Sequence, residues 1–191
     1  IYQCDWSSDV CSSDLAVFIA KHFGIPHVST GDLFRANLAQ NTPLGQEAKK
    51  FMDAGEYVPD SVTNGMVRYR LKEADAKVGF LLDGYPRTVA QVLELDGMLS
   101  GKNLDKVIVL TADTDEVVGR LLNRAKEQGR ADDTEEVIRH RQQVYLEQTQ
   151  PIIEIYQTRG IVVEIDALGQ VSEVTERILN ALTTRGLSPA R

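Results

Sequence analysis

The sequence predicts an α/β fold of the doubly wound type, in which helices cover both faces of a mostly parallel sheet. Two observations support this fold class. From residue 16 onward, short apolar runs of strand length alternate with longer stretches that have helical periodicity. One run, GFLLD at 79–83, is apolar until its last residue and follows a glycine, as is typical of a parallel strand buried on both faces. The length of 191 residues fits one domain.

The predicted elements follow one another with short connections. AVFIAKHF at 16–23 is helical and stops before Gly24, a residue type that commonly follows a helix. IPHVS at 25–29, GFLLD, KVIVLTA at 106–112 and IVVEID at 161–166 have the length and composition of strands. The remaining helices are predicted at 31–40, 44–54, 61–76, 88–99, 114–127, 133–158 and 170–184.

Composition excludes several classes of protein. The apolar fraction of 42% and the charged fraction of 26% are ordinary for a globular domain, and no apolar run is long enough to span a membrane. The net charge of −7 argues against nucleic-acid binding, so any anionic ligand must be held by a local cluster of Arg or Lys. Cys4 and Cys11 form no metal-ligand pattern with the histidines, and we expect no metal site. Without further cysteines or a signal peptide, we expect a cytoplasmic protein.

The first candidate site is VSTGDLFR at 28–35, between a predicted strand and a predicted helix. One interpretation is a helix N-cap, in which Thr30 or Asp32 accepts backbone N–H bonds. The other interpretation adds Arg35, one turn into the helix and pointing back over its positive N-terminus. That arrangement suits an anion.

The second candidate site is GFLLDGYPRT at 79–88, where a strand ends in Asp83. Ligands bind at the carboxyl ends of strands in open α/β sheets, so Asp83 is placed to touch a ligand or the water shell of a bound Mg²⁺. Arg87 offers a planar fork for a phosphate, and Gln91, one turn further on, is placed to pair with the edge of a base. A tight turn with a solvated arginine explains each residue alone, but it does not explain the whole run.

The third candidate site is the segment 120–141, which contains Arg120, Arg124, Arg130, Arg139 and Arg141. Arg120 and Arg124 are four residues apart on one helix face, where an ion pair with Glu116 is the alternative interpretation. Gly129 interrupts the helix. Arginines that converge on a helix–loop–helix predict a movable clamp on phosphates, which closes over a substrate and excludes water.

Together with the GEYVPD turn at 55–60, these stretches resemble the adenylate kinase family in order and spacing, over nearly the whole chain from residue 16. The resemblance implies a P-loop nucleoside monophosphate kinase fold, with an AMP-binding flap at 29–58 and a short lid at 121–132. It implies reversible phosphoryl transfer from ATP to AMP that gives two ADP, with Mg²⁺ accompanying ATP. It further implies a cytoplasmic monomer with no nucleic-acid or membrane partner.

The resemblance also assigns residues to roles. The implied AMP-binding residues are Thr30, Arg35, Glu56, Tyr57, Val58, Gly84, Tyr85, Pro86, Arg87, Gln91, Arg130 and Arg141. The implied ATP-binding residues are Arg124 and Gly169, with Arg120 beside the base. The implied catalytic residues are Arg87, Arg124, Arg130 and Arg141, which position the substrates and neutralise charge because the AMP phosphate attacks the γ-phosphorus directly. Thr30 and Thr88 favour AMP, and a UMP/CMP kinase remains the alternative.

The opening segment departs from the family, which begins with an apolar strand and the loop G-x-x-x-x-G-K-G-T. Counted back from VFIAKHFG, the first Gly of that loop falls at Trp6, its Lys at Ser12 and its Thr at Asp14. The glycine nest and the lysine that hold ATP phosphates are therefore missing. CDWSSDVCSSDL resembles a translated sequencing adapter, and we expect 1–15 to replace the true strand and loop. A genuinely divergent N-terminus is the alternative.

Two expectations follow for the chain as it stands. Without the loop, we expect it to bind AMP but to be catalytically dead. Without the family's first strand, its position in the sheet is vacant, and we expect Ile1 and Tyr2 to pair there.

Overall fold

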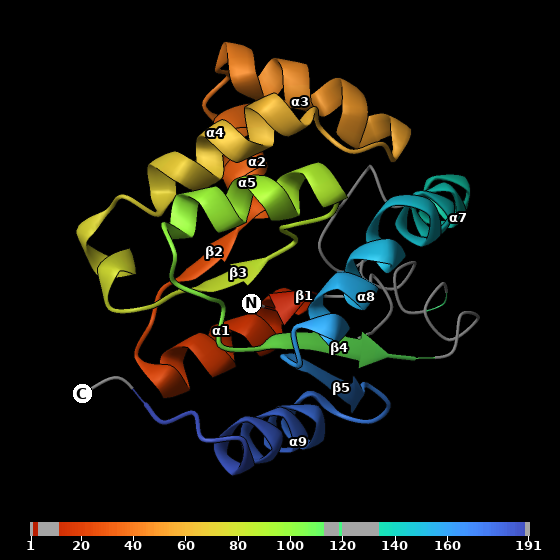
Figure 1. Cartoon of the computed structure of the whole chain (residues 1–191). Helices are drawn as coiled ribbons and strands as arrows, with labels where there is room; N and C mark the ends of the chain where they lie inside the picture. The colour runs from red at the N-terminus through yellow and green to blue at the C-terminus, as the bar shows by residue number, and fades with distance from the viewer. Residues whose placement is uncertain (1, 4–11, 113–118, 120–133, 190–191) are drawn as a thin grey trace.

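The computed structural model describes residues 2–3, 12–112, 119 and 134–189. Within these residues, the centre of the molecule is a parallel five-stranded sheet with the order β2-β3-β1-β4-β5. The strands are β1 (Tyr2–Gln3), β2 (His27–Ser29), β3 (Leu81–Asp83), β4 (Val107–Thr111) and β5 (Val162–Asp166). Helices lie on both sides of the sheet (Figure 1). The predicted α/β fold with a parallel sheet is confirmed.

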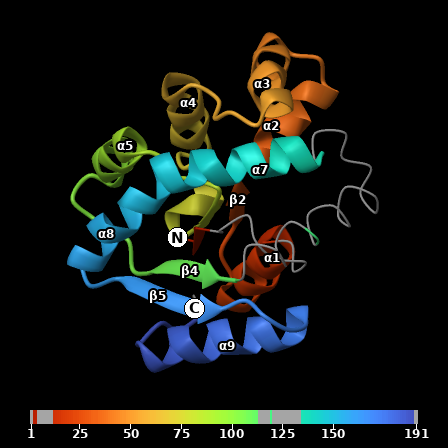
Figure 2. The ribbon, with the colours of Figure 1, turned by 90° about the vertical axis from the view of Figure 1, so that its right-hand side faces the viewer.

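Alternating side chains of the strands supply two cores, because successive residues of a strand point to opposite faces. On one face Leu81, Ile108 and Ile165 pack against α1 (Ser12–Phe23) and α9 (Val171–Thr184). On the other face Leu82 and Val109 pack against α5 (Val89–Leu99) and α8 (Gln150–Thr158). Figures 1 and 2 both show α9 and α8 on opposite sides of β4 and β5.

The N-terminal part of the chain differs from the prediction in one boundary. Tyr2 and Gln3 form the middle strand, with Tyr2 opposite Asp83 on one side and Ile108 on the other, so the expected entry of Tyr2 into the sheet is confirmed. Helix α1 begins at Ser12 rather than at residue 16. Leu15 is fully buried, because it lies one turn before Ile19 and extends the apolar stripe that faces the sheet.

Three helices between β2 and β3 stand beyond the carboxyl ends of these strands, next to α5 (Figure 1). They are α2 (Thr30–Ala39), α3 (Pro43–Ala54) and α4 (Asp60–Arg70). The single helix predicted at 61–76 is wrong in its second half, where a short 3₁₀ helix, η1 (Ala74–Lys77), follows a turn. Arg70 fixes that turn through paired hydrogen bonds of 2.8 and 2.7 Å to Asp75.

The long helix predicted at 133–158 is present as three consecutive segments. They are α7 (Glu135–Val144), a π-helical turn η2 (Tyr145–Thr149) and α8. The helix predicted at 114–127 and the lid predicted at 121–132 fall outside the described residues, except for Gly119, which is helical. Among the helices that the structure describes, none is long and apolar enough to cross a membrane.

Candidate functional site

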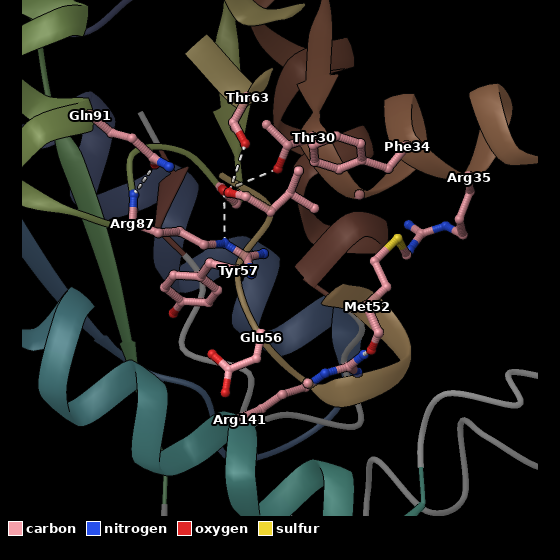
Figure 3. A pocket seen from close by; sticks show the side chains of 14 residues that line it. Thr30, Phe34, Arg35, Met52, Glu56, Tyr57, Thr63, Arg87, Gln91 and Arg141 are labelled. Atoms are coloured by element: carbon pink, nitrogen blue, oxygen red, sulfur yellow. Dashed lines mark hydrogen bonds between the residues drawn. The ribbon is translucent and has the colours of Figure 1, made fainter. Parts of the chain in front are cut away.

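A pocket lies at the carboxyl ends of β2 and β3, enclosed by α2, by the loop after α3 and by one residue of α7 (Figure 3). Nine residues that the sequence assigns to the AMP site line it: Thr30, Arg35, Glu56, Tyr57, Val58, Gly84, Arg87, Gln91 and Arg141. Parallel strands end at one edge of a sheet, and this explains why residues far apart in the sequence meet there.

The N-cap of α2 is Ser29, not Thr30 or Asp32 as the sequence predicted. The Ser29 hydroxyl accepts a hydrogen bond from the Asp32 N–H at 3.3 Å. The Thr30 hydroxyl is therefore available for a different bond, and it donates to the Gly84 carbonyl at 3.0 Å. This bond ties the end of β2 to the end of β3 at the floor of the pocket.

Glycine is required at position 84. Its φ of 72° lies in the left-handed region, and a Cβ there would lie 2.7 Å from the guanidinium of Arg87 and 3.0 Å from the hydroxyl of Thr30. Without that Cβ, Arg87 folds back over the turn and its Nε donates to the Gly84 carbonyl at 2.8 Å. The guanidinium carbon lies 5.0 Å from the centroid of the Tyr57 ring, within the range of a cation–π contact.

Gln91 lines the pocket from the first turn of α5, where it is almost completely buried. Its amide oxygen accepts a hydrogen bond from the Arg87 backbone N–H at 2.7 Å, and its amide nitrogen donates to Asp60 at 2.6 Å. Asp60 also accepts a bond from Thr88 at 2.9 Å. In this structure Gln91 therefore holds Arg87 in place, a role that its spacing did not predict.

Two further arginines face the pocket from different elements. Arg141 is buried on α7 and donates to the carbonyl of Met52, in the last turn of α3, at 2.9 Å. Arg35 points back over the first turn of α2, as the sequence predicted, and donates to Asp32 at 2.6 Å. Together with Arg87, they form a cationic cluster in a chain whose net charge is −7.

The loop after α3 carries Glu56, Tyr57 and Val58 and docks against the helical segments at 134–158. Glu56 Oε1 lies 2.6 Å from Nε2 of His140, and the Tyr57 hydroxyl lies 2.8 Å from that of Thr149. Figure 3 shows Tyr57 next to Arg87, with Glu56 lying nearer to Arg141. The walls of the pocket therefore come from α2, the end of α3 and the loop after it, α4, the turn after β3, α5 and α7.

Two residues assigned to the AMP site, Tyr85 and Pro86, do not line this pocket. Tyr85 is fully buried beneath it, and its hydroxyl donates to Asn64 at 2.8 Å. Burial, with the Asp60 carboxylate nearby, raises the pKa of Tyr85 well above the ordinary tyrosine value. The turn after β3 thus directs the Tyr85 side chain into the core, and its expected contact with AMP stays a prediction.

The residues assigned to ATP lie elsewhere or outside the described part. Gly169 follows β5 with a φ of 112° and does not line the pocket. Arg120, Arg124 and Arg130 fall outside the described residues.

A metal ion would find few protein ligands in the part of the chain that the structure describes. Asp83 is buried at the end of β3, with Oδ2 lying 3.2 Å from Nε2 of His27. No group of three or more His, Cys, Asp or Glu residues in that part is arranged to bind a metal ion. One carboxylate fits Mg²⁺ that is held mainly by water and by ligand phosphates.

Five pocket residues were not assigned to the site from the sequence, namely Gly31, Phe34, Met52, Gly55 and Thr63. Phe34 had a usable signal, since it lies four residues after Thr30 and therefore on the same face of α2. Met52 and Thr63 had none, because their positions depend on how α3 and α4 pack.

A parallel α/β sheet with arginines gathered at the carboxyl ends of its strands is characteristic of a protein that binds a phosphate-bearing ligand. The family model "Adenylate kinase" matches residues 13–161. An adenylate kinase of Nocardioides sp. is 66% identical over 169 residues, which are 87% of this chain and 88% of that protein. Those of Kocuria rhizophila and Thermobifida fusca are 60% and 51% identical over 87% and 89% of this chain, and over 90% and 91% of their own lengths. The chain belongs to the adenylate kinase family.

Proposed function

We propose that this protein, with its native first strand and phosphate-binding loop, catalyses reversible phosphoryl transfer from ATP to AMP, giving two ADP, and that the chain as it stands binds AMP without turnover. One observation carries the proposal: a pocket lined by three arginines lies at the strand ends of a chain that is 66% identical to an adenylate kinase. The reaction needs no protein nucleophile, since the AMP phosphate attacks the γ-phosphorus of ATP directly. The task of the protein is to hold two anions in line and to neutralise their charge.

AMP is the ligand proposed for the pocket. Arg87, Arg35 and Arg141 would bind its phosphate, because guanidinium groups form paired charge-assisted hydrogen bonds with phosphate oxygens. Phe34 and Val58 supply apolar surface for the base. Glu56 and Tyr57 would close the pocket from the flap at 29–58.

The ATP half of the site stays a proposal based on the family. Arg124 and Gly169 would contact ATP, with Arg120 beside its base, and Arg130 would reach the phosphates from the lid at 121–132. Mg²⁺ would arrive as the magnesium complex of ATP, with Asp83 near its water shell. A cytoplasmic monomer belongs to the same proposal.

Calorimetric titration of the chain with AMP, UMP and CMP tests the substrate assignment. We expect AMP to bind more tightly than either pyrimidine nucleotide. Equal or tighter binding of UMP or CMP would support the UMP/CMP kinase instead. No binding of any of the three would refute the proposed pocket, and a coupled assay for ADP tests turnover separately.

A further inference from the structure

Thr149 is a buried polar residue to which neither the sequence motifs nor the proposed mechanism assigns a role. It is the last residue of the π-helical turn η2 and is 1% exposed. Its hydroxyl oxygen lies 2.9 Å from the Arg87 carbonyl oxygen and 2.8 Å from the Tyr57 hydroxyl. It therefore meets two residues that line the pocket, 62 and 92 positions away in the sequence.

The direction of both hydrogen bonds follows from the number of protons. A carbonyl oxygen only accepts, so the single proton of Thr149 must be donated to Arg87. The Thr149 oxygen can then only accept from Tyr57, whose hydroxyl is the donor. The result is a directed chain from Tyr57 through Thr149 to the backbone of Arg87.

This series of hydrogen bonds positions the Arg87 guanidinium in two ways. It holds the Arg87 carbonyl, while Gln91 holds the Arg87 N–H at 2.7 Å, so both sides of this residue's backbone are anchored. It also holds the Tyr57 ring by its hydroxyl, and that ring lies against the guanidinium at 5.0 Å. The buried Thr149 hydroxyl thus fixes the position of the Arg87 main chain and the position of the Tyr57 ring beside the Arg87 side chain.

The π-helical turn places Thr149 where it can form this bridge. The Gln150 N–H donates to the carbonyl of Tyr145, five residues back, so the turn holds one residue more than an α-helical turn. One extra residue rotates the side chains that follow by about 100° relative to an uninterrupted α-helix. Turns of this kind are often found at functional sites.

We propose that Thr149 is a positioning residue, which sets the phosphate-binding guanidinium of Arg87 by bridging its carbonyl to the Tyr57 hydroxyl. The inference rests on the proposed binding of AMP in this pocket. It links the flap loop, the turn after β3 and the helical segments at 134–158 through one side chain.

The test compares AMP with adenosine, because a bridge that sets Arg87 affects recognition of the phosphate and not of the nucleoside. Calorimetric titrations use the whole chain and its variants Thr149→Val, Thr149→Ser and Tyr57→Phe. Valine keeps the shape and removes the hydroxyl, whereas serine keeps the hydroxyl. Thr158→Val is the matched control, since Thr158 lies in the same helical run and its hydroxyl donates only to Glu154, one turn back.

We expect Thr149→Val to weaken AMP binding about threefold to tenfold, the loss that corresponds to one hydrogen bond, and adenosine binding less than twofold. Thr149→Ser and Thr158→Val should stay within twofold of the parent for both ligands. Tyr57→Phe should also weaken AMP binding more than adenosine binding. In the Thr149→Val background it should weaken AMP binding by less than a further twofold, because both changes break the same series of hydrogen bonds.

Two results would overturn the inference. One is AMP binding by Thr149→Val within twofold of the parent. The other is an equal loss of AMP and adenosine binding, which indicates a role in packing only. If Thr149→Val does not fold, Tyr57→Phe decides, and unchanged AMP binding by that variant overturns the bridge. A parent chain that binds no AMP refutes the proposed function itself, and the role of Thr149 with it.

Discussion

At the scale of single residues, two fully buried tyrosines differ in the hydrogen bonding of their hydroxyl groups. The Tyr85 hydroxyl donates to Asn64 at 2.8 Å, whereas the Tyr156 hydroxyl is buried without a hydrogen-bond partner in the described structure. We expect Tyr85→Phe to lower the free energy of unfolding by about 1 kcal/mol, because the Asn64 oxygen loses its donor. Tyr156→Phe should be neutral or stabilising, because it removes an unsatisfied polar group. Denaturant unfolding of both variants measures the difference, and a larger loss for Tyr156→Phe would contradict the assignment.

The same tyrosines predict a pH dependence. Burial raises the pKa of both Tyr85 and Tyr156 above the unfolded value of 10.0. Above pH 10 the unfolded chain loses these protons while the folded chain keeps them, so stability that is fully present below pH 10 declines as the pH rises. The decline should reach about 1.4 kcal/mol per pH unit for each tyrosine. Unfolding measured between pH 8 and about 11.5 should show a shallower slope for each Phe variant than for the parent.

Arg87 is the residue on which the proposed phosphate contact depends most. Arg87→Ala should weaken AMP binding by at least tenfold, since charge-assisted hydrogen bonds contribute about 1.5–3 kcal/mol each. Arg139→Ala is the control, because Arg139 is exposed and its ion pair in the described part of the chain is with Glu135, at 3.0 Å, one turn away on α7. AMP affinity within twofold of the parent would remove Arg87 from the site.

At the scale of elements, α2 and α3 cross so closely that Gly45 has no room for a side chain. A Cβ at Gly45 would lie 2.4 Å from the backbone of Asn37, whereas nothing lies within 4 Å of one at Gly65, on α4. Gly45→Ala should therefore destabilise the protein by about 1–3 kcal/mol, because backbone atoms cannot move aside cheaply. Gly65→Ala should stabilise it by up to about 1 kcal/mol through helix propensity. Thermal unfolding of the pair checks the crossing, and equal effects would refute it.

The crossing of α2 and α3 also matters for the site, because it places Met52 and Glu56 opposite α7. Arg141 donates a hydrogen bond to the Met52 carbonyl, and His140 is hydrogen-bonded to Glu56. These two α7 residues therefore hold the end of α3 and the loop after it in place. A change at Gly45 should therefore weaken AMP binding as well as stability, whereas Gly65→Ala should leave AMP affinity within twofold of the parent.

At the scale of the whole molecule, the middle of the sheet is its shortest part. β1 contributes Tyr2 and Gln3, whereas β4 pairs with β5 over five residues. We expect replacement of residues 1–15 by an apolar strand and G-x-x-x-x-G-K-G-T-Q to raise the melting temperature and to give ADP production together. About five buried apolar side chains, at about 1.5–3 kcal/mol each, are comparable to the net stability of a domain.

A second replacement separates the two effects. The same strand with Ala in place of the loop lysine should raise the melting temperature to a similar extent but should leave little ADP production, because the lysine acts on ATP phosphates and not on packing. ADP production by the original chain at a rate near that of the first replacement would contradict the role that we assign to the loop.

Features that depend on short stretches of chain could be predicted from the amino-acid sequence. The apolar runs at 79–83, 106–112 and 161–166 are strands because their composition suits burial on both faces. The resemblance to adenylate kinases grouped Thr30 and Arg87 in one AMP site, and both residues line one pocket. The backward direction of Arg35 follows from its spacing of one helical turn. The strand positions were predictable because they depend on the composition of each run, and the direction of Arg35 because its partner Asp32 lies one helical turn away.

The contacts between distant segments could not be predicted in this way, because they depend on tertiary packing. The helical run at 134–158 is continuous in sequence pattern, yet a π-helical turn within it brings Thr149 to Tyr57, 92 positions away. Likewise, the packing of the turn after β3 sends Tyr85 into the core and leaves Gln91 holding Arg87. No local period encodes these pairings, because each depends on the angle at which two separately formed elements meet.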